Sequence, residues 1–269
     1  MNGISPNLRD PLSMFDVSGR VAIITGASGA FGRACALMLG ALGSKLVLAS
    51  GSDGELAKVL QDVESCGGTA CSIARRPDSL GNAEAIRDFA LDSFGRIDRL
   101  VIASGHNKAG PIQDLDDEDW QAVMDANVRG PWYMAKAVGT YWIEKEIKGK
   151  MLMMSSVRGR HGAVSGYTAY CTSKGAIDAL TRTLATEWGK HGITVNSIAP
   201  TVFRSRLTAW IWTDDPIGEA TRKRSLSRIP LGRLGEVEDL MGMVLYLLSP
   251  ASDFCTGQIM YVDGGFTAS

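Results

Sequence analysis

The chain has 269 residues, and its 28 lysines and arginines are almost balanced by 29 aspartates and glutamates. A net charge of -1 and a hydrophobic content of 45% indicate a globular protein with an ample core, and they exclude the positive field that gripping nucleic acid requires. The longest apolar run, around Leu240 to Leu248, is far shorter than the roughly twenty residues of a membrane span, and Met1 to Ser13 lacks the apolar stretch of a secretory signal, so we expect a cytoplasmic protein without nucleic-acid or membrane partners.

Cysteine and histidine are sparse and scattered. The five cysteines form no Cys-x-x-Cys pair, and the three histidines are far apart. This pattern predicts neither a disulfide framework nor a metal site. Glycine, at 31 positions, is the overrepresented residue, which indicates tight turns or close approach of the backbone to a ligand.

Strand-like and helix-like segments alternate along the whole chain. The strand-like segments are short, apolar and bounded by turns, as expected for strands covered on both faces. They are Val21–Thr25, Lys45–Ala49, Ala70–Ala74, Leu100–Ser104, Lys150–Ser155, Thr194–Ile198 and Gln258–Val262. Helical periodicity lies in Gly32–Leu42, Glu55–Cys66, Asn82–Phe94, Asp116–Lys145, Tyr167–Lys190 and Glu236–Leu248. The alternation predicts the α/β class: a doubly wound, Rossmann-like parallel sheet of about seven strands with helices on both faces.

No linker or shift in composition divides the sequence. We therefore expect residues 1–269 to form a single Rossmann-type domain, with residues 1–16 as an N-terminal extension. Residues 201–233 differ, because Trp210, Trp212 and several arginines and lysines stand there with only weak periodicity. We expect this segment to leave the sheet as a lid over a substrate, with burial of the tryptophans in an oligomer interface as the alternative.

A glycine-rich turn joins the first strand to the first helix. Its sequence is Gly26-Ala27-Ser28-Gly29-Ala30-Phe31-Gly32. Small residues let such a turn approach a pyrophosphate, whose charge is met by free N–H groups and by the helix N-terminus. A glycine-rich turn alone is a weak signal, but its place after the first strand favours a dinucleotide site over a plain tight turn.

The end of the second strand bears on which dinucleotide is bound. This position, which reads the adenosine ribose in dinucleotide folds, is Ser50, followed by Gly51 and Ser52. A carboxylate there would bind two ribose hydroxyls and repel a 2′-phosphate, so its absence favours NADP slightly over NAD. No arginine that clamps such a phosphate is evident; Arg33 is the nearest in sequence, with a solvated helix position as its alternative.

A tyrosine and a lysine stand four residues apart at the start of a predicted helix. In Tyr170-Cys171-Thr172-Ser173-Lys174 the two side chains share one helix face. An ammonium beside a phenol favours the phenolate, which predicts a lowered pKa for Tyr170. The preceding strand ends in Ser155 and Ser156 on opposite faces, so one hydroxyl can hold a carbonyl oxygen while the tyrosine protonates it.

With these motifs the chain resembles the short-chain dehydrogenase/reductase family, from about Val17 to Phe266. The matching residues are Thr25-Gly26-x-x-x-Ala30-x-Gly32, Asn127 in Asn127-Val128-Arg129-Gly130, Ser156, Tyr170-x-x-x-Lys174, Asn196-x-x-x-Pro200 and Val262-Asp263-Gly264-Gly265. Their order and spacing make the resemblance specific. It implies a catalytic domain that interconverts a secondary alcohol and a ketone with NAD(P), and by analogy alone a homotetramer.

The resemblance also implies a role for each site residue. Tyr170 is the acid/base, Ser156 orients the substrate, Lys174 lowers the tyrosine pKa and binds the nicotinamide ribose, and Asn127 anchors a proton-relay water. Ser155 faces away. The residues expected to bind the cofactor are Gly26, Ser28, Gly29, Ala30, Phe31, Gly32, Ser50, Ser104, Gly105, Tyr170, Lys174, Pro200, Val202 and Ser205.

Three positions depart from the family pattern. Ala30 replaces the middle glycine of the loop, Ile102-Ala103-Ser104-Gly105 replaces Asn-Asn-Ala-Gly, and Ala74-Arg75-Arg76 replaces the aspartate after the third strand. These departures bear on cofactor affinity and preference more than on the chemistry.

The substrate is left open by the sequence. The loops after the strands carry His106, Lys108, Arg158, Arg160 and His161, which either bind an anionic or polar substrate or are solvated. We expect a polar small molecule such as a polyol, sugar acid or hydroxy acid. A 3-oxoacyl thioester reductase is one alternative, and a non-catalytic NAD(P)-binding regulator, suggested by Ala30 and the altered fourth-strand motif, is another.

Overall fold

The computed structural model describes residues 6–164 and 166–268, and a single parallel sheet forms its centre. The strand order is β3-β2-β1-β4-β5-β6-β7. The strands are β1 (Val21–Thr25), β2 (Lys45–Ser50), β3 (Thr69–Ala74), β4 (Arg99–Ile102), β5 (Lys150–Met154), β6 (Thr194–Pro200) and β7 (Ile259–Val262). The predicted fold class is confirmed, and β4 is the strand that ends clearly early, before the expected Ser104.

Helices connect successive strands. The α-helices are α1 (Pro6–Arg9), α2 (Ala30–Ala41), α3 (Asp53–Ser65), α4 (Leu80–Phe94), α5 (Asp117–Met124), α6 (Gly130–Glu144), α7 (Thr168–Trp188), α8 (Pro216–Leu226) and α9 (Met241–Leu248). Short helical turns are η1 (Pro11–Phe15), η2 (Ile112–Asp114), η3 (Asp125–Arg129), η4 (Val157–Gly159), η5 (Gly189–His191), η6 (Arg206–Trp212), η7 (Val237–Leu240) and η8 (Pro250–Ser252). In the described ranges, no helix is long and apolar enough to cross a bilayer.

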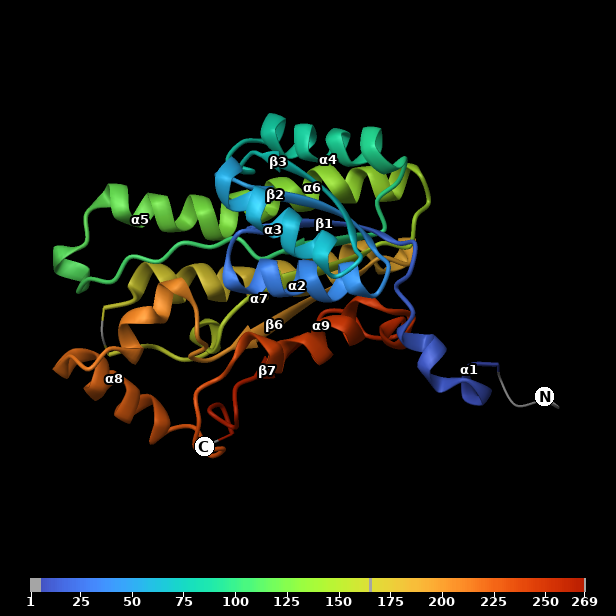
Figure 1. Ribbon diagram of the computed structural model, residues 1–269. Coiled ribbons are helices and arrows are strands. Elements are labelled where there is room, and N and C mark those ends of the chain that lie inside the picture. The colour runs from blue at the N-terminus through green and yellow to red at the C-terminus, as the bar shows by residue number, and fades with distance from the viewer. Residues whose placement is uncertain (1–5, 165, 269) are drawn as a thin grey trace.

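The helices cover both faces of the sheet because alternate strand residues point to opposite sides. In β1, Ala22 and Ile24 pack with α2, α3 and α9, whereas Ile23 packs with α4, α6 and α7. Figure 1 shows α4 and α6 on one side of the strands and α2 and α9 on the other. From β1 the chain first adds β2 and β3 on one side of the sheet, and then returns to add β4 to β7 on the other side, so the direction reverses between β1 and β4. Ligands of such sheets bind outside the carboxyl ends of the strands at this reversal.

Three predicted segments differ in detail. The expected helix Asp116–Lys145 is divided by a π-helical turn, Asp125–Arg129. The predicted lid, residues 201–233, contains α8, which the sequence did not indicate. This helix starts at Pro216 because the Asp215 carboxylate accepts hydrogen bonds from the N–H groups of Ile217 and Gly218, both at 3.0 Å. The predicted N-terminal extension holds α1 and η1, and its residues 1–5 lie outside the described residues.

The two ends of the sheet have different surroundings. The loops that lead to α5 and α8 leave the carboxyl ends of β4 and β6, and Figure 1 shows these two helices at one end of the molecule, with α1 at the other. The candidate site residues therefore gather at the α5 and α8 end.

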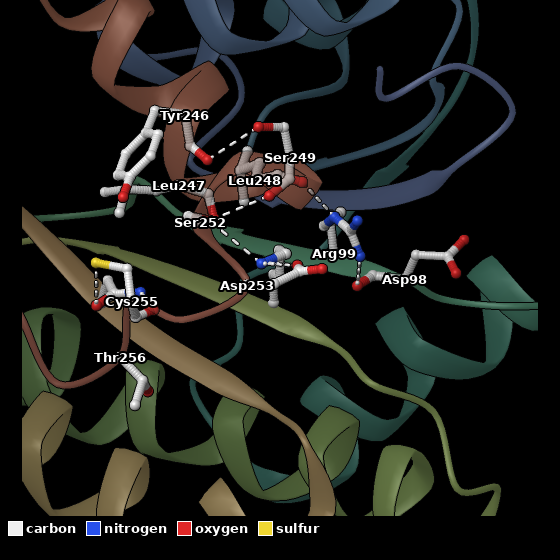
Figure 2. Close-up of polar contacts among 12 residues, drawn as sticks. Asp98, Arg99, Tyr246, Leu247, Leu248, Ser249, Ser252, Asp253, Cys255 and Thr256 are labelled. Carbon is white, nitrogen blue, oxygen red and sulfur yellow. Dashed lines mark hydrogen bonds and ion pairs between the residues drawn. The ribbon is translucent and has the colours of Figure 1, made fainter. Parts of the chain in front are cut away.

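A buried cationic cluster ties the opposite, amino end of the sheet to the C-terminal segment. Arg99, which begins β4, is 6% exposed. Its Nε donates to the carbonyl oxygen of Leu248 at 2.6 Å and its Nη1 to the carbonyl oxygen of Asp98 at 3.0 Å, as Figure 2 shows. Burial lowers the Arg99 pKa to about 10, so the side chain stays charged at neutral pH. In the same cluster Lys150 donates to Ser252 at 3.2 Å and pairs with Asp253 at 2.8 Å.

Replacing Arg99 with methionine is expected to destabilise the fold. The substitution keeps the apolar stem but leaves the buried Leu248 carbonyl without this donor, so the free energy of unfolding should fall by about 2 to 3 kcal/mol. Urea denaturation measures it. Arg129→Met is the matched control, because Arg129 pairs with Asp125 at 2.9 Å with both side chains exposed and should matter much less. Equal losses in the two variants would contradict the role given to Arg99.

Candidate active site

The glycine-rich turn forms a cradle at the carboxyl end of β1. Gly26 has a φ of +66°, and a Cβ there would lie 2.5 Å from the backbone nitrogen of Ser104. A Cβ on Gly32 would overlap the carbonyl oxygen of Gly26 and lie 2.8 Å from the Cα of Ala27. Gly29 is the N-cap of α2 and supplies no side-chain hydrogen bond to it, so the N-terminal N–H groups are available to an anion. Ala30 is the first residue of this helix.

Serines line the end of β2, where the sequence places the adenosine ribose. The Ser28 hydroxyl donates to that of Ser50 at 3.1 Å, and the Ser52 N–H donates to Ser50 at 3.4 Å. Arg33, the arginine nearest in sequence, does not serve this position. It binds Asp62 of α3, with both Nε and Nη2 at 2.8 Å from the carboxylate.

Arg76 is the residue that the sequence argument missed. A Cβ built on Gly51 would lie 3.0 Å from the Cζ of Arg76 and would also overlap its Nε, so this guanidinium lies directly against Gly51. Arg76 comes from the loop after β3. Sequence reasoning had considered an arginine that binds the 2′-phosphate only near the glycine-rich turn and β2. The signal was the substitution of Ala74-Arg75-Arg76 for the usual acidic residue, combined with glycine at position 51. The neighbouring Arg75 instead donates to Asn82 at 2.6 Å.

Asn127 lies in the π-helical turn η3, between α5 and α6, and is 1% exposed. Its Oδ1 accepts from the His106 N–H at 2.7 Å, and its Nδ2 donates to the His106 carbonyl at 2.8 Å and to Ser173 Oγ at 2.9 Å. Ser173 in turn donates to the Tyr170 carbonyl at 2.8 Å. Asn127 therefore links the loop after β4 to the helix that carries Tyr170. Its role as anchor of a relay water stays a prediction.

Ser155 and Ser156, at the end of β5, contact different residues of helix α7. Ser155 Oγ donates to Asp178 Oδ1 at 2.5 Å. Ser156 hydrogen bonds with the Tyr170 phenol, and its Oγ also lies 3.4 Å from the carbonyl oxygen of Pro200. The hydroxyls of Ser156, after β5, and Tyr170, in α7, are thus brought together at the carboxyl edge of the sheet.

The pKa of Tyr170 moves against the prediction. We expected Lys174 to lower it, but burial raises the Tyr170 pKa above its usual range, opposed by the hydrogen bond to Ser156 and by the positive charge of Arg158. The ammonium of Lys174 lies 5.5 Å from the centroid of the tyrosine ring, and it donates to the Met154 carbonyl at 2.6 Å. The cost of burying the phenolate of Tyr170 is larger than the stabilisation by Lys174 that the four-residue spacing suggested.

Lys174 is itself buried, at 5% exposure. Burial lowers its pKa to about 8, opposed by the negative charge of Asp178. The lysine is therefore mainly protonated at neutral pH. One of its three N–H bonds is given to Met154, which leaves donors for a ligand. A Cβ on Gly105 would lie 3.4 Å from Asn127 Oδ1 and 3.9 Å from Lys174 Nζ, so this glycine keeps the space beside both groups open.

The other predicted cofactor residues surround this edge. Phe31 packs edge-on against Phe203 with ring centroids 5.9 Å apart. The Ser104 hydroxyl lies 3.3 Å from that of Thr25, and Pro200 ends β6. The carbonyl of Val202 accepts from the Gly235 N–H at 3.0 Å, and Ser205 caps η6 together with Thr208. Their contacts with a cofactor stay predictions.

The cationic loop residues lie in three different places. Lys108 pairs with Asp119 at 2.8 Å, and His106 contributes its backbone to Asn127. Arg158 and His161 face the ring of Phe266, with the Arg158 Cζ 5.8 Å and the His161 ring centroid 6.0 Å from its centroid. Arg160 lies 5.9 Å from the centroid of Tyr261. Only some of the predicted set therefore gathers at one place.

These residues fit a nicotinamide dinucleotide. The side-chain-free cradle at Gly26 and Gly32 and the uncapped N-terminus of α2 suit a pyrophosphate. The hydroxyls at Ser28 and Ser50 suit the adenosine ribose, and buried Lys174 has donors for the other ribose. Among the described residues, no group of histidine, cysteine, aspartate or glutamate could hold a metal ion.

Comparison with known proteins agrees with this geometry. Residues 26–267 match the family model described as Enoyl-(Acyl carrier protein) reductase. An uncharacterized oxidoreductase of Mycobacterium tuberculosis is 48% identical over 263 residues, covering 98% of this chain and 96% of the relative.

Two solved structures are similar over nearly their whole length. A short-chain type dehydrogenase/reductase from Mycobacterium marinum has a TM-score of 0.90 and 31% identity, covering 96% of this chain and 99% of that one. A protein of Agrobacterium tumefaciens assigned as a 2-deoxy-d-gluconate 3-dehydrogenase, with bound NADP, has a TM-score of 0.87 and 30% identity, covering 95% and 99%.

Gly32→Ala is expected to weaken cofactor binding at least about ten-fold, because the new methyl group would displace the Gly26 carbonyl and with it the cradle. Fluorescence titration with NADPH measures this loss. Gly54→Ala is the matched control, since a Cβ at Gly54 in α3 meets nothing within 4 Å. The control should bind as the parent does. Unchanged binding by Gly32→Ala would show that the cradle does not hold the pyrophosphate.

Proposed function

Because the chain belongs to the short-chain dehydrogenase/reductase family and is an NAD(P)-dependent oxidoreductase acting on CH–OH and C=O groups, we propose that it interconverts a secondary alcohol and a ketone of a small polar molecule, with Tyr170 as acid/base. The observation that carries the proposal is the place of Tyr170 beside both Ser156, whose hydroxyl lowers the pKa of the phenol, and buried Lys174, whose Nζ lies 5.5 Å from the centroid of the tyrosine ring. Bound NAD(P)H supplies the hydride.

The proton chemistry follows from the two hydroxyls. Ser156 and Tyr170 can both donate to one carbonyl oxygen, which holds and polarises it. As charge develops on that oxygen, Tyr170 passes its proton to it; in the reverse direction the phenolate accepts the proton of the alcohol. The raised pKa keeps the phenol protonated at neutral pH, which favours the donating form before reduction.

Lys174 supports this transfer through its charge. With a pKa of about 8, its ammonium is mainly protonated at neutral pH and opposes the cost of forming a phenolate at Tyr170. Asp178 helps to retain that proton on Lys174. Above pH 8 the ammonium is progressively lost, and with it the stabilisation of the phenolate.

A polar, acidic substrate is the better supported class. The site edge carries Arg158, and the similar solved structure from Agrobacterium tumefaciens is assigned to a gluconate-type substrate. The 3-oxoacyl thioester alternative is supported by the description of the family model. The comparisons speak against the non-catalytic alternative, because the similar proteins are oxidoreductases that act on CH–OH and C=O groups.

We propose NADP as the preferred cofactor. The guanidinium of Arg76 lies against Gly51, the residue that follows Ser50, where the 2′-phosphate of a bound NADP is expected. A planar guanidinium can donate two parallel hydrogen bonds to a phosphate. Bound NADP in the Agrobacterium tumefaciens structure supports the same preference.

We also propose a cytoplasmic homotetramer. The five cysteines Cys35, Cys66, Cys71, Cys171 and Cys255 are all free thiols, as is usual in a reducing compartment. On α6, one of the predicted interface helices, Trp132 is 44% exposed, which suits a surface that another subunit covers.

Tyr170→Phe is expected to lower turnover by about 100-fold or more while NADPH still binds, because only the proton donor is removed. Absorbance at 340 nm measures turnover across a panel of polyols, sugar acids, hydroxy acids, steroids and acetoacetyl thioester, with both cofactors.

Tyr167→Phe is the matched control. Tyr167 contacts the Tyr170 ring edge-on, with centroids 6.3 Å apart, and it should keep most of the activity. Full turnover by Tyr170→Phe would contradict the proposed mechanism.

Arg76→Met is expected to weaken NADPH binding about ten-fold or more and to leave NADH binding unchanged, because the lost hydrogen bonds go to the 2′-phosphate alone. Titration of each reduced cofactor measures the ratio. Arg75→Met is the control, because this neighbour is engaged by Asn82. Equal losses for both cofactors, or a parent protein that prefers NADH, would refute the assignment of Arg76.

A further inference from the structure

Two arginines from distant segments share one aromatic ring. The Cζ of Arg228, in the segment after α8, lies 4.1 Å from the centroid of Phe266, and the Cζ of Arg158, in η4, lies 5.8 Å from the same centroid. Phe266 is 3% exposed and packs with Val157 and Ile229. The ring therefore holds two positive charges near each other on a rigid apolar support.

The described residues place no carboxylate within ion-pair distance of either Arg158 or Arg228. The Nη1 of Arg158 donates to the Gly162 carbonyl at 2.6 Å, which fixes the side chain without neutralising it. Burial lowers the Arg158 pKa, and so does the positive charge of Arg228. An anion beside the pair would relieve this repulsion.

The arginine pair borders the reacting groups. Arg158 is two residues from Ser156, and its N–H donates to Ser156 Oγ at 3.1 Å. Its charge also acts on the phenol of Tyr170, whose pKa it lowers against the larger effect of burial. Arg158 is therefore close to both reacting groups, and the shared ring of Phe266 places Arg228 near Arg158.

A third polar group at the same ring lacks a partner. His161 contacts Phe266 edge-on, and its Nε2 is buried without a hydrogen-bond partner. Buried polar atoms are nearly always satisfied, so this nitrogen has hydrogen-bonding capacity that the chain itself does not use. This observation is independent of the arginine charges.

We propose that Arg158, Arg228 and His161 form a subsite for the carboxylate of a small polyhydroxy acid whose alcohol or ketone carbon lies at Ser156 and Tyr170. The planar fork of a guanidinium matches a carboxylate in two hydrogen bonds. The subsite rests on the proposed function, and it names the substrate class for that same site.

The test compares D-gluconate with D-glucitol, which has a hydroxymethyl group in place of the carboxylate. Calorimetry with the protein loaded with the reduced cofactor NADPH, which cannot oxidise an alcohol, measures binding of each at constant ionic strength. The parent should bind gluconate at least about ten-fold more tightly than glucitol. Arg158→Met and Arg228→Met should each abolish most of that difference, and Arg228→Lys should restore part of it.

Arg160→Met is the matched control, because Arg160 lies over Tyr261 in the same loop; it should keep the preference for gluconate. Circular dichroism establishes that each variant folds, and Arg228→Met carries the test if Arg158→Met does not fold. Equal binding of the two compounds, no binding of gluconate at millimolar concentration, or a preference that survives in the folded arginine variants would overturn the subsite.

Acetoacetyl-coenzyme A forms a further arm of the test. If its binding depends on the two arginines and that of gluconate does not, the anion recognised is a phosphate and the proposed carboxylate subsite is wrong. The proposed function fails separately, through full turnover by Tyr170→Phe. A parent protein that reduces neutral ketones through Tyr170 without any carboxylate preference would retain the function and refute the subsite.

Discussion

The burial of the Lys174 ammonium is the constraint on which the site depends. A buried cation is costly unless polar partners surround it, and the end of β5 supplies them. The Met154 carbonyl accepts its hydrogen bond directly, and the Asp178 carboxylate acts on it through charge. Ser155 donates to Asp178, and the next residue, Ser156, contacts the phenol of Tyr170. One strand end thus supports both the lysine and the tyrosine. Gly159 completes this arrangement, because a Cβ there would lie 2.5 Å from Asp178 Oδ2.

The π-helical turn performs a similar task from the other side. An extra residue in one turn of a long helix changes which side chain faces inward. In this chain it places Asn127 between the His106 backbone and Ser173, one turn from Tyr170. The loop after β4 and helix α7 are thereby joined by hydrogen bonds that do not involve Ser156, so the helix that carries Tyr170 is held at a second point.

The sequence predicted the fold, and it indicated a catalytic set whose roles stay a prediction, because both depend on patterns that are local in the chain. Apolar runs such as Val21–Thr25 and the four-residue spacing of Tyr170 and Lys174 need no tertiary information. What it could not predict depends on distant contacts. The raised Tyr170 pKa comes from burial by surrounding elements, and the place of Arg76 beside Gly51 comes from pairing of β2 with β3. Helix α8 was missed because its residues are too polar to show an apolar periodicity.

Buried polar groups have different surroundings at the two ends of the sheet. At the amino end, Arg99 and Lys150 are matched by carbonyl, hydroxyl and carboxylate partners within the chain, as a structural role requires. Of the three buried side-chain atoms without a partner in the described part of the chain, Asn107 Oδ1 and His161 Nε2 belong to the loops after β4 and β5, and Thr194 Oγ1 begins β6. Two of the three therefore lie at the carboxyl end, where Arg158 and Arg228 also lack carboxylate partners. Native folds leave few such groups unpaired, since each one costs stability. At the carboxyl end these groups keep hydrogen-bonding capacity that the chain itself does not use, which is consistent with the place of the proposed substrate site.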